Sequence, residues 1–224
     1  MTRPRVLLAL FASAAAVDLL SLAAGFGPGH MLAKPLLMPL LAAWAARRGA
    51  PGLLPAALAC GWGGDTLLLL DADPAFLGGM ACFAAGHVCY LVLFTRVGRP
   101  HARAVALVPC YAVVLIATVV LLWPGLPQEL RGPVAVYSAL LTAMACAAAV
   151  RLGPVAGAGG VLFLLSDTLI ATGVAGWPQP PRPDLWIMLT YLAAQFLLVR
   201  GVLDALVGRR EPAAAYREVR STTP

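Results

Sequence analysis

Long apolar stretches, separated by short clusters of Gly, Pro and Arg, constrain the fold of this 224-residue chain more than any other feature. A helix needs roughly 20 apolar residues to cross the hydrocarbon core of a bilayer, and most of the stretches have about that length. Charged residues make up 12% of the chain, about half the share that soluble domains carry. We therefore expect an all-α membrane protein.

The breaks between the stretches predict where each helix ends. Clusters such as RRGAPG at 47–52 and WPQPPRPD at 177–184 stop a helix, and because all the breaks are short, neighbouring helices should pack antiparallel. The sequence thus predicts a bundle of eight transmembrane helices forming a single domain over residues 1–208, followed by a disordered cytoplasmic tail over 209–224. The predicted spans cover about residues 6–26, 30–46, 53–71, 75–95, 104–123, 133–150, 155–176 and 184–207.

Arginine gathers at one set of span ends, including the ends near residues 47, 99, 151 and 209, while Arg131 and Arg182 lie at the other set. Cytoplasmic loops carry an excess of Lys and Arg, so both termini are expected in the cytoplasm. This rule accounts for the net charge of +6 without a nucleic-acid partner. Abundant Ala, Gly, Pro and Arg suggest a GC-rich genome, and hence a bacterial source and the plasma membrane.

An acidic motif occurs twice inside apolar stretches, as GGDTLLLL at 63–70 and as LLSDTLIA at 164–171. The copies lie in the third and seventh spans, which cross in the same direction. A weaker echo between the fourth and eighth spans would make the fold two four-helix halves, although Ala/Leu-rich helices also produce such echoes by chance. Each ionisable group near the middle of a span costs roughly 2.5–3.5 kcal/mol to insert. Asp65 and Asp167 are therefore expected to face a polar chamber.

Other polar side chains lie at similar depths when residues are counted at 1.5 Å each from the span ends. Asp18, Lys34 and Tyr191 reach the layer of the two aspartates, and Gln195 lies slightly deeper. We interpret Lys34 as a contact for an anionic head group and the other three as residues that orient the substrate or water. Asp18 could equally neutralise Lys34 and brace two helices.

Deeper towards the cytoplasmic side lie His87 and, one turn further, Tyr90. Both join the predicted orienting residues, although His87 could equally be a packing histidine. Ser166, beside Asp167, is placed in the same group, because no G-x-S-x-G elbow surrounds it to make it a nucleophile. Tyr137 is interpreted as packing or local hydrogen bonding.

The residue types in the spans favour acid–base chemistry. Of three histidines only His87 lies inside a span, and no P-loop, GxGxxG or HExxH motif occurs, so no metal site is expected. Two carboxylates in one low-dielectric site cannot both ionise easily. One can then keep its proton as a general acid while the other acts as a base.

Five motifs, in order over residues 5–205, resemble those of the YhhN-type lysoplasmalogenase family of integral membrane alkenyl ether hydrolases. The resemblance implies an eight-span enzyme that cleaves the vinyl ether bond of lysoplasmalogens with water, giving a fatty aldehyde and a glycerophospho-alcohol. It implies that Asp65 and Asp167 are the catalytic pair, that no cofactor is required and that the partners are a lysophospholipid and the bilayer. The motifs are KPLLMPLL at 34–41, GD at 64–65, FLGGMACFAAGHVCY at 76–90, GAGGVLFLLSD at 157–167 and YLAAQFLL at 191–198.

Two other functions fit the same residues. A proton-coupled transporter of a lipid or small amphiphile would also need buried acids, and it predicts flux without a new chemical product. A non-catalytic membrane scaffold predicts that Asn at positions 65 and 167 changes stability only. The sequence leaves open the head group, the chain length, the leaflet of entry, the oligomeric state and which aspartate is the acid.

Overall fold

The computed structural model describes residues 3–70 and 72–222, and the chain there is helical apart from short connections. The predicted all-α fold is therefore confirmed. The helices are α1 (Arg3–Ala24), α2 (Gly27–Arg47), α3 (Leu53–Leu67), α4 (Asp73–Val97), α5 (Ala102–Val105), α6 (Val108–Leu122), α7 (Gln128–Leu152), α8 (Pro154–Val174) and α9 (Pro183–Thr222).

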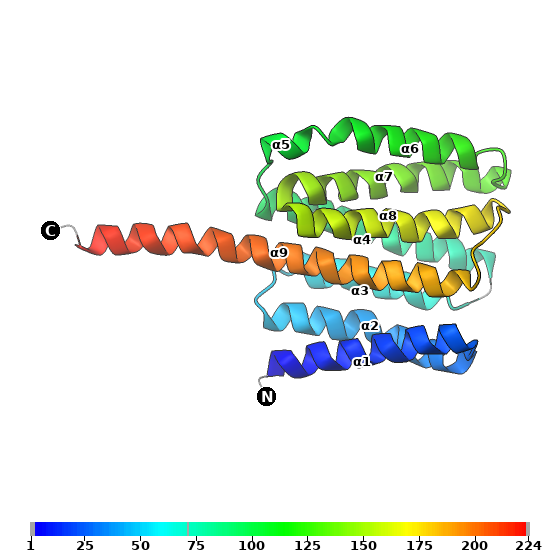
Figure 1. The fold of residues 1–224 in the computed structure, drawn as a ribbon, viewed down its shortest axis with the longest axis horizontal. Coiled ribbons are helices and arrows are strands. Elements are labelled where there is room, and N and C mark those ends of the chain that lie inside the picture. Colours follow the sequence, from blue (N-terminus) through cyan, green and yellow to red (C-terminus); the bar gives the residue numbers. More distant parts are fainter. Residues whose placement is uncertain (1–2, 71, 223–224) are drawn as a thin grey trace.

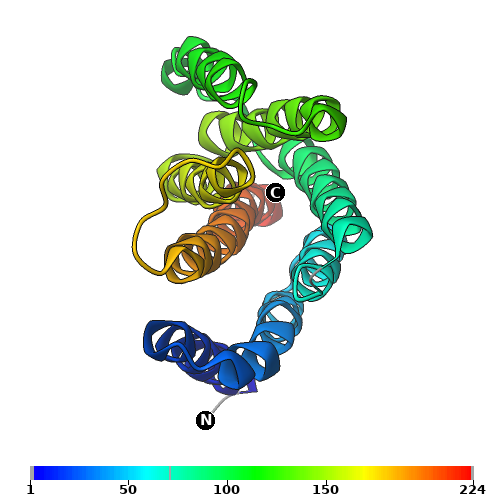
Figure 2. The ribbon, with the colours of Figure 1, turned by 90° about the vertical axis from the view of Figure 1, so that its right-hand side faces the viewer.

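The long helices run side by side, and α1 begins on the same side of the bundle on which α9 ends (Figure 1). Seen along the helices, α1 to α4 form a curved row that α7 continues, and α8 and α9 lie on its concave side (Figure 2). Helix α9 packs mainly on α8 and also contacts α1, α2, α4 and α7. It therefore joins the two halves of the chain, and the short α5 and α6 lie at the periphery.

Six helical stretches of the described chain are long and apolar enough to cross a membrane, judged by length and composition. Two of the eight predicted spans fall short of that criterion, because α3 has only 15 residues and because α2 carries His30 and Lys34. Apolar side chains also cover the outside of the bundle, with Leu32 76% exposed and Val136 72% exposed. Such a surface is stable in lipid and not in water, so the chain is an integral membrane protein.

The eight predicted helices all form, but the predicted bounds of the third, fifth, sixth and eighth were wrong. The third ends at Leu67 rather than at 71, and residues 68–70 form a turn. The fifth is divided into α5 and α6, because Pro109 lacks the N–H that would continue the helix from α5. The sixth begins at Gln128, five residues early, and so contains Pro133, whose missing N–H removes one hydrogen bond inside the helix.

Helix α9 continues through Thr222, beyond the predicted end of the membrane domain at 208. This extension projects away from the other helices (Figure 1). A single helix without tertiary packing is marginal in water. The helical backbone of this extension does not test the predicted disorder of residues 209–224, which stays a prediction. The predicted division of the bundle into two four-helix halves also stays a prediction.

Glycines let α8 lie close to both of its neighbours. A Cβ atom added to Gly160 would lie 2.7 Å from the Cα of Ala145 on α7, and one added to Gly159 would lie 3.0 Å from the carbonyl oxygen of Ala194 on α9. Small residues allow this backbone approach in membrane helices. Asp167 lies two turns further along α8, so the close packing of the glycines fixes the position of its carboxylate.

Candidate functional site

A cavity of about 370 Å³ lies among α2, α3, α4, α8 and α9. Both aspartates of the repeated motif line it, Asp65 from α3 and Asp167 from α8, together with Lys34 from α2 and Tyr191 from α9. The cavity extends to Gln179, in the connection between α8 and α9. The structure thus brings these four predicted site residues together from four helices.

Asp65 is held by a row of hydrogen bonds that starts on α9. The Tyr191 hydroxyl donates to Oδ2 of Asp65 at 2.8 Å, and the Gln195 amide Nε2 donates to the Tyr191 oxygen at 3.3 Å. Tyr90 on α4 completes the row by donating to Oε1 of Gln195 at 2.6 Å. All four side chains are buried. Tyr90 and Gln195 therefore support Asp65 from behind and do not line the cavity.

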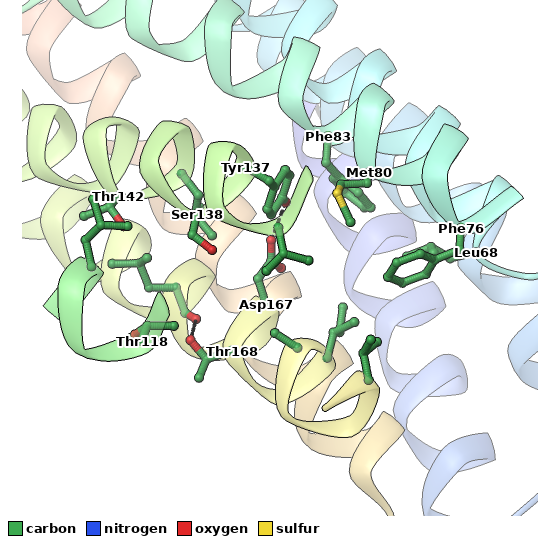
Figure 3. Close-up of a pocket in the computed structure, with 17 residues that line it drawn as sticks. Leu68, Phe76, Met80, Phe83, Thr118, Tyr137, Ser138, Thr142, Asp167 and Thr168 are labelled. Atoms are coloured by element: carbon green, nitrogen blue, oxygen red, sulfur yellow. Dashed lines mark hydrogen bonds between the residues drawn. The ribbon is translucent and has the colours of Figure 1, made fainter. Parts of the chain in front are cut away.

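Asp167 is held by a second tyrosine, Tyr137 on α7, for which the sequence predicts only packing or local hydrogen bonding. The Tyr137 hydroxyl donates to Oδ2 of Asp167 (Figure 3), and the same oxygen lies 3.1 Å from Nε2 of His87. Since the tyrosine proton points to the carboxylate, His87 donates through Nε2. Its Nδ1 atom has no partner among the described residues. A count from the start of the predicted sixth span could have placed Tyr137 within about one turn of the aspartate layer.

Aromatic rings fix the orientation of these supporting side chains. The ring of Tyr191 meets Phe83 and Phe163 edge to face, with centroids 5.9 and 5.4 Å apart. The imidazole of His87 meets Phe163 in the same manner at 4.8 Å. Edge-to-face packing of this kind restricts ring rotation. The hydroxyl of Tyr191 is thereby kept pointing at Asp65.

Lys34 is a buried cation that no described carboxylate neutralises directly. Its side chain is only 8% exposed, it lines the cavity, and its ammonium group interacts electrostatically with Asp65. No ion pair within 4 Å joins it to a carboxylate in the described chain. Since a buried charge is costly without a partner, this position suits an anionic ligand.

Asp18 has a different partner from the one that the sequence suggested. Its Oδ1 atom lies 2.7 Å from Nδ1 of His30, so it braces α1 against α2 through that histidine and not through Lys34. The carboxylate is fully buried, and its Oδ2 atom has no partner in the described residues. His30 was not among the predicted site residues because it stands at the end of a predicted span. Neither Asp18 nor His30 lines the cavity.

Ser166 lines the cavity, but its hydroxyl is already bonded. The Oγ atom donates to the backbone carbonyl of Ile187 at 3.1 Å and so ties α8 to α9. Residues of the predicted site therefore divide into two groups. Those that line the cavity are Lys34, Asp65, Ser166, Asp167 and Tyr191, and those that lie behind it are Asp18, His87, Tyr90 and Gln195.

A smaller, mostly apolar groove of about 70 Å³ adjoins the cavity between α4, α6, α7 and α8. Asp167 borders both, with Thr118, Ser138 and Thr142 on one side of it and, on the other, Leu68 from the turn after α3 and the α4 side chains Phe76, Met80 and Phe83 (Figure 3). Asp65 and Lys34 line only the larger cavity. The residues common to the two are Leu68, Phe76, Phe83, Asp167, Ile170 and Val174.

The side chains that line the cavity include the carboxylates of Asp65, Asp167 and Asp184, the ammonium group of Lys34 and the hydroxyl of Tyr191. In the described part of the chain no group of three or more His, Cys, Asp or Glu is placed to hold a metal ion. Carboxylates that line one cavity can give and take protons on a molecule bound in it. The lysine adds a fixed positive charge on the side of Asp65.

Comparison with known proteins identifies similar sequences and no similar solved structure. The family model described as the YhhN family matches residues 29–202. The human protein named lysoplasmalogenase TMEM86B is 35% identical over 159 residues, which cover 71% of this chain and 67% of the relative. A Mycobacterium tuberculosis protein named lysoplasmalogenase is 31% identical over 157 residues, 66% of this chain and 59% of the relative. No solved structure matches.

Proposed function

Because this chain belongs to the YhhN family, we propose that it is an integral membrane hydrolase that cleaves the vinyl ether bond of lysoplasmalogen-type lysophospholipids. The products are a fatty aldehyde and a glycerophospho-alcohol. The relatives named lysoplasmalogenase, from mammals and mycobacteria, support this activity. The substrate reaches the site from the bilayer in which the protein lies.

The observation that carries the proposal is the shared cavity of Asp65 and Asp167, with Lys34 beside them. The two aspartates lie far apart in the sequence, and each is oriented by a tyrosine hydroxyl. A structural role would need no open space between them. The volume and the polar lining provide room for a glycerophosphate and a water molecule next to two proton-transfer groups.

The chemistry follows from the reactivity of a vinyl ether. A proton from one carboxylic acid adds to the alkene carbon distal to the oxygen, and the positive charge spreads over the ether oxygen as an oxocarbenium ion. The other carboxylate stabilises this cation and takes a proton from the water that attacks it. The hemiacetal so formed collapses to aldehyde and alcohol. Glycosidases use two carboxylates in a related way, although there the proton goes to oxygen.

Lys34 is the proposed contact for the phosphate of the head group. Its ammonium group is buried, lines the cavity and has no direct carboxylate partner in the described chain. Burying a phosphate next to it satisfies both charges. Asp18 and His30 brace the helix that carries Lys34, one turn before it.

The proposed location is the bacterial plasma membrane with both termini in the cytoplasm. The arginine-rich breaks at residues 47–52, 96–103 and 151–154 lie on the side of the bundle where α1 begins (Figure 1), as positively charged cytoplasmic loops would. The connection that borders the cavity, between α8 and α9, then faces the outside. Trp123 and Trp177 lie at that same end, where aromatic belts occur.

Release of fatty aldehyde from a lysoplasmenyl lipid tests the function. We expect aldehyde from the detergent-purified wild type and a loss of about a thousandfold or more in kcat for Asp65→Asn and for Asp167→Asn, because each change removes a proton-transfer group. Asp204→Asn is the matched control, since Asp204 is exposed on α9 and far along it from the cavity. All variants must elute as folded protein. Full activity in either site variant would remove that aspartate from the mechanism.

Transport of a lipid or amphiphile is the competing function, and the same lipid distinguishes the two. Protein reconstituted into sealed vesicles would move the lipid intact between leaflets if it were a transporter. The hydrolase instead yields aldehyde in detergent, where no sealed compartment exists. Flux of intact lipid together with no aldehyde from folded wild type would overturn the proposal.

A further inference from the structure

We propose that the groove between α4, α6, α7 and α8 holds the hydrocarbon chain of the substrate and that Asp167 is the acid that protonates its vinyl carbon. Asp65 is then the base that acts on water. This inference rests on the proposed function and deepens it, because it gives the two halves of the substrate separate places and the two carboxylates separate roles.

The lining of the groove matches a hydrocarbon chain. Apolar side chains such as Met80, Leu115 and Leu141 surround it, and the polar groups among them are hydroxyls such as Thr118 and Ser138 and the Tyr137–Asp167 pair. Helix α6 forms the outer wall of the groove. Among the residues of α6, which the structure describes in full, only Leu122 is buried. The groove therefore borders the lipid phase, and a chain longer than the groove can extend into the bilayer.

The polar cavity fixes the other end of the substrate. Lys34 lines this cavity and not the groove, so a phosphate bound to Lys34 places the glycerol in the cavity. The ether oxygen links the glycerol to the first vinyl carbon, and the distal vinyl carbon begins the chain. The vinyl ether must then lie where cavity and groove meet, with its distal carbon on the groove side.

Asp167 is the carboxylate that lies at this junction. It borders both spaces, whereas Asp65 borders only the cavity. Asp65 shares the polar cavity with Lys34, and neither of them lines the groove. Asp167 has apolar groove on one side instead. The position of each acid therefore matches its role, with the proton donor at the carbon that receives the proton.

Other titratable groups surround Asp167 from each neighbouring helix. Tyr137 on α7 donates to it, and His87 on α4 bonds to that tyrosine. The carboxylate of Asp65 on α3 interacts electrostatically with the carboxylate of Asp167. The remaining titratable and charged groups that line the same cavity are Lys34, Asp184 and Tyr191.

The protons balance without an outside donor. The O–H bond of Asp167 breaks and its proton forms a C–H bond with the distal vinyl carbon, using the π electrons. Water then bonds to the oxocarbenium carbon and loses a proton to the Asp65 carboxylate. In the collapse, Asp167 takes the hemiacetal hydroxyl proton, the carbon–oxygen bond to glycerol breaks, and Asp65 gives its proton to the departing glycerol oxygen. Both residues end in their starting states.

Narrowing the groove tests where the chain lies. Ser138→Phe places a ring in the groove from α7. Ala139→Phe is the matched control, because Ala139 is exposed and does not line the groove. With a hexadecenyl lysolipid we expect kcat/KM to fall about tenfold or more in Ser138→Phe, and with a hexenyl lysolipid to fall much less. The control should stay within about twofold for both chains.

A second pair of variants guards against misfolding at Ser138. Thr118→Phe narrows the groove from the peripheral helix α6, and Ala117→Phe, on its exposed face, is the control. Equal losses for the long and short chains in folded Ser138→Phe and Thr118→Phe would overturn the chain site. Absence of aldehyde from folded wild type would instead overturn the proposed function, so the two failures are distinguishable.

The pH dependence of residual activity tests the assignment of the acid. In Asp167→Asn, hydronium can replace the missing acid, so the residual rate should rise about tenfold per unit of falling pH. In Asp65→Asn it should rise with pH instead, because hydroxide replaces the missing base. The double Asn variant provides the background of non-enzymatic acid hydrolysis. The opposite pattern, or the same profile in both single variants, would overturn the assignment.

Discussion

At the scale of single residues, Asp65 and Asp167 each accept one tyrosine hydroxyl at the Oδ2 atom. Tyr191 donates to Asp65 and Tyr137 donates to Asp167. The Oδ1 atoms accept no hydrogen bond among the described side chains. One oxygen of each acid is thus used for orientation, and the other is free to face the substrate.

Removing one of these hydroxyls should lower turnover more than binding. Tyr191→Phe leaves Asp65 without its donor and leaves the Gln195 amide without its acceptor. We expect kcat for aldehyde release to fall about tenfold to a hundredfold, with KM changed by less than about threefold, since the lost bond positions a reacting group. Tyr111→Phe, outside the cavity on α6, is the matched control. A rise in KM with unchanged kcat would contradict this role.

Lys34→Met should have the reverse effect. The substitution keeps the length of the side chain and removes the charge proposed to hold the phosphate. We expect KM to rise about tenfold or more and kcat to fall by less, because phosphate binding is equally strong in the ground state and the transition state. Arg200→Met, exposed on α9, controls for the loss of one positive charge. An equal fall in kcat and kcat/KM would remove Lys34 from head-group binding.

Sequence could identify the charged residues of the site but not all of their partners. Asp65, Asp167 and Lys34 stand out because an ionisable group inside an apolar stretch is costly. Tyr137 and His30 do not, since tyrosine is common in spans and histidine common at their ends. Which side chain meets which depends on how each helix is rotated about its axis. Spans that are apolar all round do not fix that rotation, and so Asp18 pairs with His30 and not with Lys34.

At the scale of the helices, the position of Asp167 depends on how closely α8 approaches α7. Gly160→Ala would put a Cβ atom 2.7 Å from the Cα of Ala145, and backbone cannot move aside as a flexible side chain can. We expect the free energy of unfolding to fall by about 1–3 kcal/mol, measured by denaturation in detergent. Gly173→Ala, on the same helix, is the control, because the nearest atom to its Cβ lies at 3.8 Å. Equal stability of the two variants would contradict this packing argument.

The number of long apolar helices could be predicted from the sequence, whereas the positions at which helices begin, end or divide could be predicted less well. The eight apolar stretches mark the helices because hydrocarbon requires long apolar segments with internal hydrogen bonds. Proline has two opposite outcomes that composition does not separate. Pro109 divides α5 from α6, whereas Pro133 lies within α7. Pro35 and Pro39 also lie inside α2 without dividing it, so a proline in an apolar stretch does not by itself mark the end of a helix.

At the scale of the whole molecule, the arrangement of the helices predicts which loops lie outside. Residue 179, beside the cavity, should be extracellular, and residue 48, at the opposite end, cytoplasmic. In a cysteine-free background, we expect a membrane-impermeant maleimide to label Gln179→Cys in intact cells and Arg48→Cys only after permeabilisation. The two sites act as controls for each other. Labelling of Arg48→Cys alone in intact cells would reverse the proposed orientation.

The junction at Asp167 has a consequence for the release of the products. One compartment borders lipid and the other extends to the connection between α8 and α9. Hydrolysis cuts an amphiphile into an oil-soluble part and a water-soluble part, and each part already occupies the compartment that borders its own phase. The two products separate by partition and do not compete for one exit. Dilution into two immiscible phases then drives the reaction forward, and recombination at the site is suppressed without a moving lid.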